Sequence, residues 1–221
     1  MESTCKLHQP AAFARGQCPS SAPAAEWSYA EEKLEADYSL PSSALSSIGG
    51  SVESGHSATL GLFVRKASAR VGVDYRAVPR EDGGWCAVID KVKVSVQLIP
   101  SIRIAREIAS SESCAARETM DHEMTHYRIE REAVIGLEPH VRAAASGAFS
   151  FPIEAATEDG LEKAMASLKA PFDAWIMKAI EEASAPGHSR FDQDEAQARR
   201  AGGDRCSGET IEAASRIVRT R

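Results

Sequence analysis

The spacing of apolar residues changes its period once along this chain, and that change restricts the fold more than any other feature. Between Leu60 and Ile104, apolar and polar residues alternate, which predicts three or four half-buried strands. After Cys114 the period becomes helical, and neither proline nor glycine occurs from Ala115 to Ile135. Strands followed by helices are typical of an α+β domain, so we expect a small, mostly antiparallel sheet followed by helices.

Further helices are expected after residue 135. The Glu158–Ala183 pattern predicts a long helix that Pro171 kinks, and Pro186-Gly187 is a loop signal beyond it. The other expected helical segments are Pro139–Ala145 and Asp192–Ala201.

The N-terminal part of the chain carries few signals of order. Residues 1–58 are rich in Pro, Ser and Ala, which predicts a disordered or loosely packed segment with one short helix over Ala24–Ala36. The expected organisation is therefore this segment, one domain over 59–206 and a C-terminal tail over 207–221.

Charge and hydropathy narrow the function classes. The 221 residues carry a formal net charge of −6, which argues against a nucleic-acid binder, since such proteins present a basic face. No apolar run is long enough to span a bilayer, and the first residues, Met1–Lys6, do not form a recognisable signal peptide.

The sequence His122-Glu123-Met124-Thr125-His126 is the most specific motif in the chain. It has the form HExxH and lies within the best-supported helix, where a spacing of four places both imidazoles on one face. Both can then ligate one metal ion, with zinc the expected ion, and Glu123 can act as general base towards a water.

A catalytic zinc ordinarily has a third protein ligand. Glu130 lies two turns, about 12 Å, from His122, so it is expected to be a supporting or surface ion-pair residue. The segment around His188 and Asp192 follows a long helix that could return the chain to the site, and Asp192 is the preferred third ligand.

His188 remains either an alternative ligand or a hydrogen-bond donor to the tetrahedral intermediate. Glu138 and His140, after the break at Gly136, are the local competitors for the third position.

HEMTH on a helix after a small sheet resembles the zincin clan of metallopeptidases. The flanking run of Cys86 to Val96, Ile102 to Ala105 and Cys114 is similar to uncharacterised bacterial families of zinc proteases. The resemblance implies zinc, a protein or peptide substrate cleaved at a peptide bond, and a secreted or periplasmic site. It also implies that His122 and His126 bind the metal and that Glu123 is the base. The longer metzincin motif and a clear gluzincin glutamate are both missing from the sequence.

Two function classes remain open at this point. One is a zinc-dependent endopeptidase or amidase, and the other is a catalytically inactive relative that binds a partner or a metal. Substrate specificity and oligomeric state are left open by the sequence.

The five cysteines match no zinc-finger spacing. Cys86 precedes an extended run and Cys114 precedes the metal helix, so we expect a Cys86–Cys114 disulfide that joins the sheet to that helix.

Overall fold

The computed structural model describes residues 18, 22–49, 59–109, 114–201 and 206. The chain forms two compact units. Within the described residues, unit 1 comprises the parts of the chain up to Glu26, from Val71 to Val94 and from Arg142 to Phe172, and unit 2 comprises the rest. Several long elements pass from one unit into the other, and each unit has its own core.

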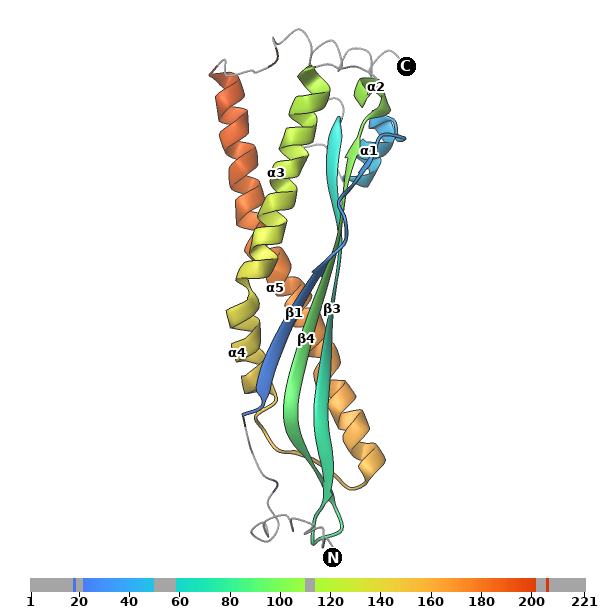
Figure 1. Ribbon diagram of the computed structural model, residues 1–221, viewed down its shortest axis with the longest axis vertical. Helices are drawn as coiled ribbons and strands as arrows, with labels where there is room; N and C mark the ends of the chain where they lie inside the picture. The colour runs from blue at the N-terminus through green and yellow to red at the C-terminus, as the bar shows by residue number, and fades with distance from the viewer. Residues whose placement is uncertain (1–17, 19–21, 50–58, 110–113, 202–205, 207–221) are drawn as a thin grey trace, which may run out of the picture. The chain divides into compact units, whose positions relative to one another are not determined.

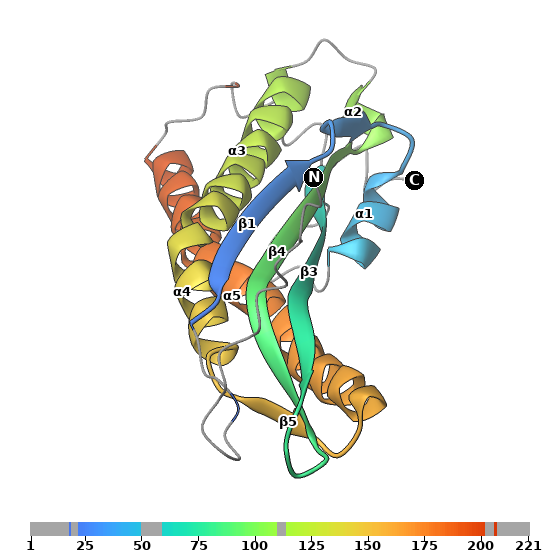
Figure 2. The same cartoon turned by 60° about the horizontal axis from the view of Figure 1, so that its bottom comes forward.

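The sheet is built around one long strand. β3 (Gly61–Pro79) and β4 (Trp85–Ile104) are consecutive and paired, and β1 (Ala24–Glu31), β2 (Glu35–Asp37) and β5 (Ile153–Ala155) also pair with β4. Figure 1 shows β1, β4 and β3 side by side, and Figure 2 shows β5 beside the start of β4. The architecture is therefore α+β, as predicted.

The prediction of a mostly antiparallel sheet is wrong in part. β5 pairs with β4 in antiparallel fashion, but β2 pairs with it in parallel, with Glu35 opposite Ser101 and Asp37 opposite Arg103. The reason is connectivity. β2 precedes the β3–β4 hairpin and reaches β4 without a tight turn, so no hairpin fixes its direction.

The strand region contains fewer and longer strands than predicted. Two strands occupy residues 61–104, and Pro100 lies inside β4 rather than interrupting it. The turn signal at Gly83-Gly84 is confirmed. Gly83 has φ of 88°, a left-handed conformation that glycine adopts without steric cost, and its N–H bonds the carbonyl of Arg80 at 3.1 Å.

Residues 24–48, which composition assigned to a loose N-terminal segment, contain β1, β2 and α1 (Ser42–Ile48). The short helix expected over Ala24–Ala36 is wrong, because this stretch pairs with β4 as strands. Leu45 of α1 is fully buried. The predicted domain boundaries at 58/59 and 206/207 stay a prediction, and residues 207–221 lie outside the described residues.

The helices follow the sheet in the predicted order. They are α2 (Arg106–Ala109), α3 (Cys114–Gly136), α4 (Glu138–Ala148) and α5 (Glu158–Arg200). Pro139 is the second residue of α4, where its missing N–H leaves no bond unmade. The loop predicted at Pro186-Gly187 is wrong, since α5 continues through both residues and includes the separate helix expected from Asp192.

Each unit buries an apolar core. In unit 2, the core lies beneath α3, where Met120 and Met124 pack on a buried cluster. That cluster comprises Leu45, Ile102, Ile104, Ala105 and Ile108. In unit 1, the buried residues of β4, β5, α5 and the turn after α4 include Ile89, Val92, Phe149, Ile153, Leu161 and Met165.

Two disulfides replace the predicted one. Cys18 bonds Cys86, with Cα atoms 5.6 Å apart, and Cys114 bonds Cys206, with Cα atoms 5.5 Å apart, so the predicted Cys86–Cys114 pair is wrong. Cys86 is the second residue of the 20-residue β4, and the short segment after that strand is not long enough to bring Cys114 back to its start. Disulfides are typical of oxidising compartments, so both bonds are consistent with an extracellular or periplasmic location. Within the described residues, no helix has the length and apolar character needed to cross a membrane.

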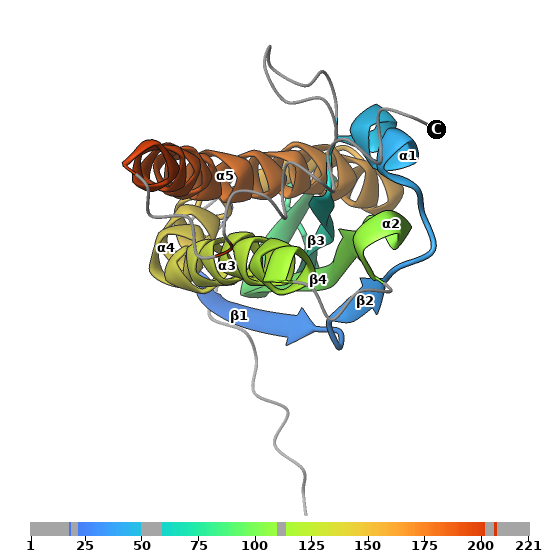
Figure 3. The same cartoon turned by 90° about the horizontal axis from the view of Figure 1, so that it is seen from above.

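A half-buried carboxylate, that of Glu31, links β1 to α3. Glu31 accepts hydrogen bonds from the Tyr127 hydroxyl and from Arg131 Nε, the latter at 3.0 Å. In Figure 3, α3 lies between β1 and the C-terminal half of α5. Burial acts to raise the pKa of Glu31, but the bonds from Tyr127 and Arg131 outweigh it and hold that pKa below its usual value.

We expect Glu31→Gln to lower the free energy of unfolding by about 1–3 kcal/mol near pH 7, because two charge-assisted bonds are weakened. The folded-state pKa of Glu31 is lowered, so its contribution is complete above the usual carboxyl pKa and disappears as pH falls through the folded-state value. The difference between wild type and variant should therefore shrink in acid. Urea unfolding at pH 7 and near pH 3 measures it, and Glu35→Gln, at an exposed position of β2, is the control. An equal difference at both pH values would contradict the assignment.

Candidate metal centre

The HExxH segment lies in the middle of α3, as the helical period predicted. The Nε2 atoms of His122 and His126 face each other at 3.0 Å. A carboxylate oxygen of Glu123 and the imidazole nitrogens all lie within 4.8 Å of one another. These three side chains therefore form a candidate metal-binding group on one long helix.

Asp192 reaches the same point from α5. Its Oδ1 lies 3.1 Å from His126 Nε2 and 3.8 Å from His122 Nε2. A tetrahedral zinc with bonds near 2.0–2.1 Å would hold its ligand atoms about 3.3 Å apart. The three atoms thus have the separations of one face of such a tetrahedron, and the structure brings together the three residues that the sequence proposed as ligands.

His188 of α5 lies beside His126 and lines the same cavity. Its Nδ1 lies 2.8 Å from His126 Nδ1, the ring nitrogen that does not face His122. Its Nε2 lies 3.3 Å from Glu130 Oε2. His188 therefore contacts His126 from behind, which is the position of a supporting residue.

Glu130 does not belong to the candidate group formed by His122, Glu123 and His126. It is 1% exposed and pairs with Arg65 of β3 as well as His188. Burial acts to raise its pKa, but the bonds from His188 and Arg65 hold the pKa below the usual value. Glu138 and His140 belong to α4, His140 is exposed, and neither lines the cavity at the site.

The electrostatics of the site suit a metal ligand set. Burial and the nearby His122 lower the pKa of His126 to about 4, so this imidazole is neutral at pH 7 and can donate a lone pair. His122 donates from Nδ1 to Glu195 Oε2 at 2.7 Å, which leaves its Nε2 lone pair directed at His126 and Asp192.

Glu123 is held separately from the candidate ligands. It is 6% exposed, and its Oε2 accepts a bond of 2.6 Å from the Phe63 N–H of β3. Burial raises the pKa of Glu123 to about 7, against the opposing effects of His122 and the Phe63 N–H. A carboxyl group with this pKa is suited to take up and release a proton near neutral pH.

Two glycines permit the close approach of neighbouring elements to α3. A Cβ at Gly61 of β3 would lie 2.4 Å from Thr119 Cγ2 and 2.7 Å from Glu123 Oε1. A Cβ at Gly187 of α5 would lie 2.7 Å from Ile129 Cγ2. Gly187 directly precedes His188, and because it has no side chain, the part of α5 that carries His188 can pack closely against α3.

A cavity of about 430 Å³ opens beside these residues. Leu62 and Phe63 of β3 and Ala185 of α5 supply apolar surface, while His122, Glu123 and Asp192 supply polar atoms. The Phe191 ring lies 5.0 Å from the His122 ring and 5.2 Å from the His126 ring, so it packs against both imidazoles.

Sequence reasoning gave no role to Arg65 or Gly61 and interpreted Gly187 only as part of a loop signal. Glu195 belongs to the same C-terminal cluster of candidate residues as His188 and Asp192, and the three recur at helical intervals on one face. The loop signal at Pro186-Gly187 concealed that period. Arg65 and Gly61 act across the fold, and no local pattern indicates such contacts.

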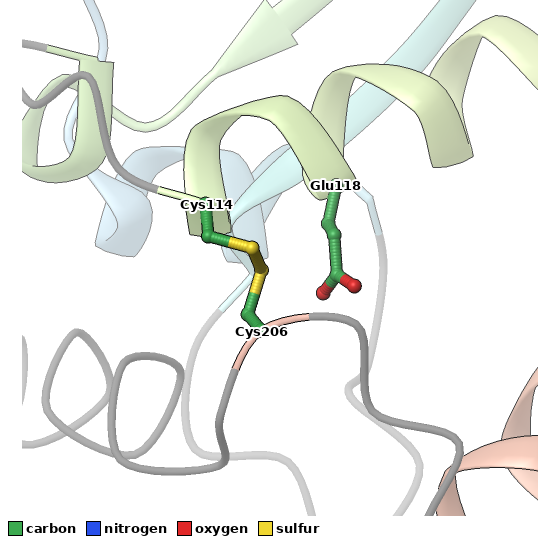
Figure 4. A group of neighbouring side chains, drawn as sticks. All are labelled: Cys114, Glu118 and Cys206. Carbon is green, nitrogen blue, oxygen red and sulfur yellow. A yellow bond between two sulfur atoms is a disulfide. The ribbon is translucent and has the colours of Figure 1, made fainter.

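The second group of neighbouring ligand-type residues is Cys114, Glu118 and Cys206. Its two sulfurs are bonded to each other, and Figure 4 shows Glu118 one turn along α3 on the same side as the disulfide. The bond joins the start of α3 to the segment that follows α5. In this oxidised form neither sulfur is a thiolate ligand, so the group serves as a cross-link between the two parts of the chain that supply the site.

No family model, curated protein or solved structure matches this chain. The metal-centre assignment therefore depends on the residues and distances described above.

We expect Gly187→Ala to destabilise the protein by about 1–3 kcal/mol and to weaken metal binding, because the new methyl group must push α5 away from Ile129. Gly147→Ala is the matched control. It lies in α4 with no atom within 4 Å of a new Cβ, so it should be neutral or stabilising by up to about 1 kcal/mol. Thermal unfolding and zinc titration measure both effects. Equal behaviour of the two variants would show that the close approach is unimportant.

Proposed function

We propose that this protein is a zinc-dependent hydrolase that cleaves peptide bonds. The observation that carries the proposal is the triangle formed by His122 Nε2, His126 Nε2 and Asp192 Oδ1, with edges of 3.0, 3.1 and 3.8 Å. Two imidazoles and one carboxylate form a donor set that zinc prefers, and three protein ligands leave a fourth position for water or substrate.

The side chains around the triangle support catalysis rather than storage. A zinc ion held there supplies a Lewis acid that lowers the pKa of a coordinated water and polarises a substrate carbonyl. Glu123 lies within 4.8 Å of the imidazole nitrogens, close enough to accept a proton from an attacking water. With its pKa raised to about 7 by burial, the same carboxyl can pass that proton to the leaving nitrogen.

The position of β3 favours an extended peptide as the substrate. Among the described strands, β3 pairs with β4 alone, so its other edge is free of strand partners. The Phe63 N–H points from that edge to Glu123, and in a strand the backbone groups of Gly61 and Arg65 share its direction. All three residues line the cavity, so a peptide could add to this edge as a further strand and bring a carbonyl to the metal.

The competing function is a non-catalytic metal-binding or partner-binding protein. A closed site of four protein ligands would favour it. Among the described residues, Glu195 is a further carboxylate that could act as a fourth ligand. Its Oε2 contacts His122 Nδ1, away from the facing Nε2 atoms of the two histidines. The three-atom donor set and the cavity beside Glu123 favour the hydrolase.

The first test is metal stoichiometry. We expect about one zinc per chain in wild type, loss of zinc in His126→Ala, and at least tenfold weaker zinc binding in Asp192→Ala, because each removes one corner of the triangle. Glu138→Ala, at a position outside the cavity, is the control and should bind zinc like wild type. Elemental analysis and chelator competition supply the numbers. Retention of full affinity in Asp192→Ala would remove it from the ligand set.

The second test separates the base from the ligands. Glu123→Gln should keep zinc and fold, because the amide oxygen can still accept the Phe63 N–H, but should lower peptide hydrolysis by about 10²–10⁴-fold. The assay is cleavage of an unstructured protein such as casein by the metal-loaded enzyme, with cleavage sites read by mass spectrometry. Activity within threefold of wild type would eliminate Glu123 as the base.

A further inference from the structure

A line of hydrogen bonds runs away from His126 on the side opposite His122. His126 Nδ1 contacts His188 Nδ1 at 2.8 Å, and His188 Nε2 contacts Glu130 Oε2 at 3.3 Å. The other oxygen of Glu130 pairs with Arg65. The participants come from α3, α5 and β3, so this line joins the three elements that surround the candidate site.

The direction of these bonds can be worked out from the buried end. Glu130 is 1% exposed and paired with a guanidinium group, so it is an anion that only accepts hydrogen bonds. His188 must therefore carry its proton on Nε2 and donate it to Glu130. When His188 Nδ1 carries no proton, it is a lone-pair acceptor that receives a bond from His126 Nδ1–H.

The position of this proton also determines what His126 presents at Nε2, the nitrogen that faces the other candidate ligands. With its proton fixed on Nδ1, His126 presents a lone pair at Nε2, the atom that lies 3.0 Å from His122 Nε2 and 3.1 Å from Asp192 Oδ1. The Arg65–Glu130 pair thus favours, through His188, the tautomer of His126 that can bind a metal, whereas Asp192 Oδ1, 3.1 Å from Nε2, favours the other tautomer.

We propose that His188 is a positioning residue that holds His126 in its metal-binding tautomer and orientation, an inference that rests on the metal site proposed above. It is neither a ligand nor a donor to the substrate, since both of its ring nitrogens are engaged on the far side of His126. Outer contacts of this kind commonly change metal affinity by about 10–100-fold.

The two histidines of the motif are supported in different ways. His122 donates directly to Glu195, which is 29% exposed and also paired with Arg199. His126 is supported through the intervening imidazole of His188, with the carboxylate of Glu130 one residue further away and paired with Arg65. This arrangement orients His126 without placing another negative charge against it.

The test compares substitutions of His188 that retain either its contact with His126 or its contact with Glu130. In His188→Asn, the amide oxygen can take the place of Nδ1 and accept from His126, whereas in His188→Gln the longer amide reaches Glu130 instead. His188→Phe keeps the ring and removes both bonds. His140→Phe, at an exposed position of α4, is the matched control. Circular dichroism and thermal unfolding establish folding for each variant.

Two readouts are needed. Zinc affinity is measured by chelator competition, and we expect a loss of at least tenfold in His188→Phe and His188→Gln, with His188→Asn and the control within threefold of wild type. The tautomer of His126 is measured in metal-free protein by nitrogen-15 NMR of the imidazole. A larger fraction of His126 rings should carry the proton on Nδ1 in wild type and His188→Asn than in His188→Phe, where Asp192 at Nε2 has no competing acceptor at Nδ1.

The outcomes separate this inference from the proposed function. Wild-type zinc binding together with unchanged affinity and tautomer in His188→Phe would overturn the role of His188 alone. Failure of wild type to bind zinc would overturn the proposed function, while the metal-free tautomer would still test His188. If His188→Phe does not fold, equal affinity and equal tautomer in the Asn and Gln variants would overturn the role.

Discussion

The close packing of α5 on α3 at Gly187 and Ile129 is the contact on which the candidate site depends. α3 alone supplies two imidazoles and a carboxylate, and a pair of ligands on one helix is an incomplete zinc site. Because no side chain separates the helices at Gly187, the residues that follow it, His188 and Asp192, come within bonding distance of His126. The Cys114–Cys206 bond joins the ends of the same two segments covalently.

The sequence predicted the parts of this site that depend on local spacing. A helical period free of glycine and proline located α3, and the interval of four placed His122 and His126 on one face. Asp192 was proposed because a single helix cannot supply a third corner, which is an argument from geometry, and the structure places it beside both imidazoles. Whether it binds a metal stays a prediction.

The errors have a common physical cause. The predictions used local sequence signals at positions where tertiary contacts determine the structure. Pro186-Gly187 is a loop signal in isolation, but here the glycine serves a helix-to-helix contact and α5 continues. The stretch over 24–36 looked helical or loose, yet it gains backbone bonds by pairing with β4. Cys18 and Cys206 lie outside the patterned region, so their partners could not be read from spacing.

The separation of the candidate ligands along the chain has a consequence for the order in which the protein matures. His122 and His126 are made some 66 residues before Asp192, and Glu195 follows later still. A nascent chain that has completed α3 alone can offer a metal ion only two imidazoles, so tight loading must wait until α5 has been synthesised and has packed. Any hydrolytic activity would therefore arise late in biogenesis, and a chain shortened before residue 192 would be unable to assemble the site at all.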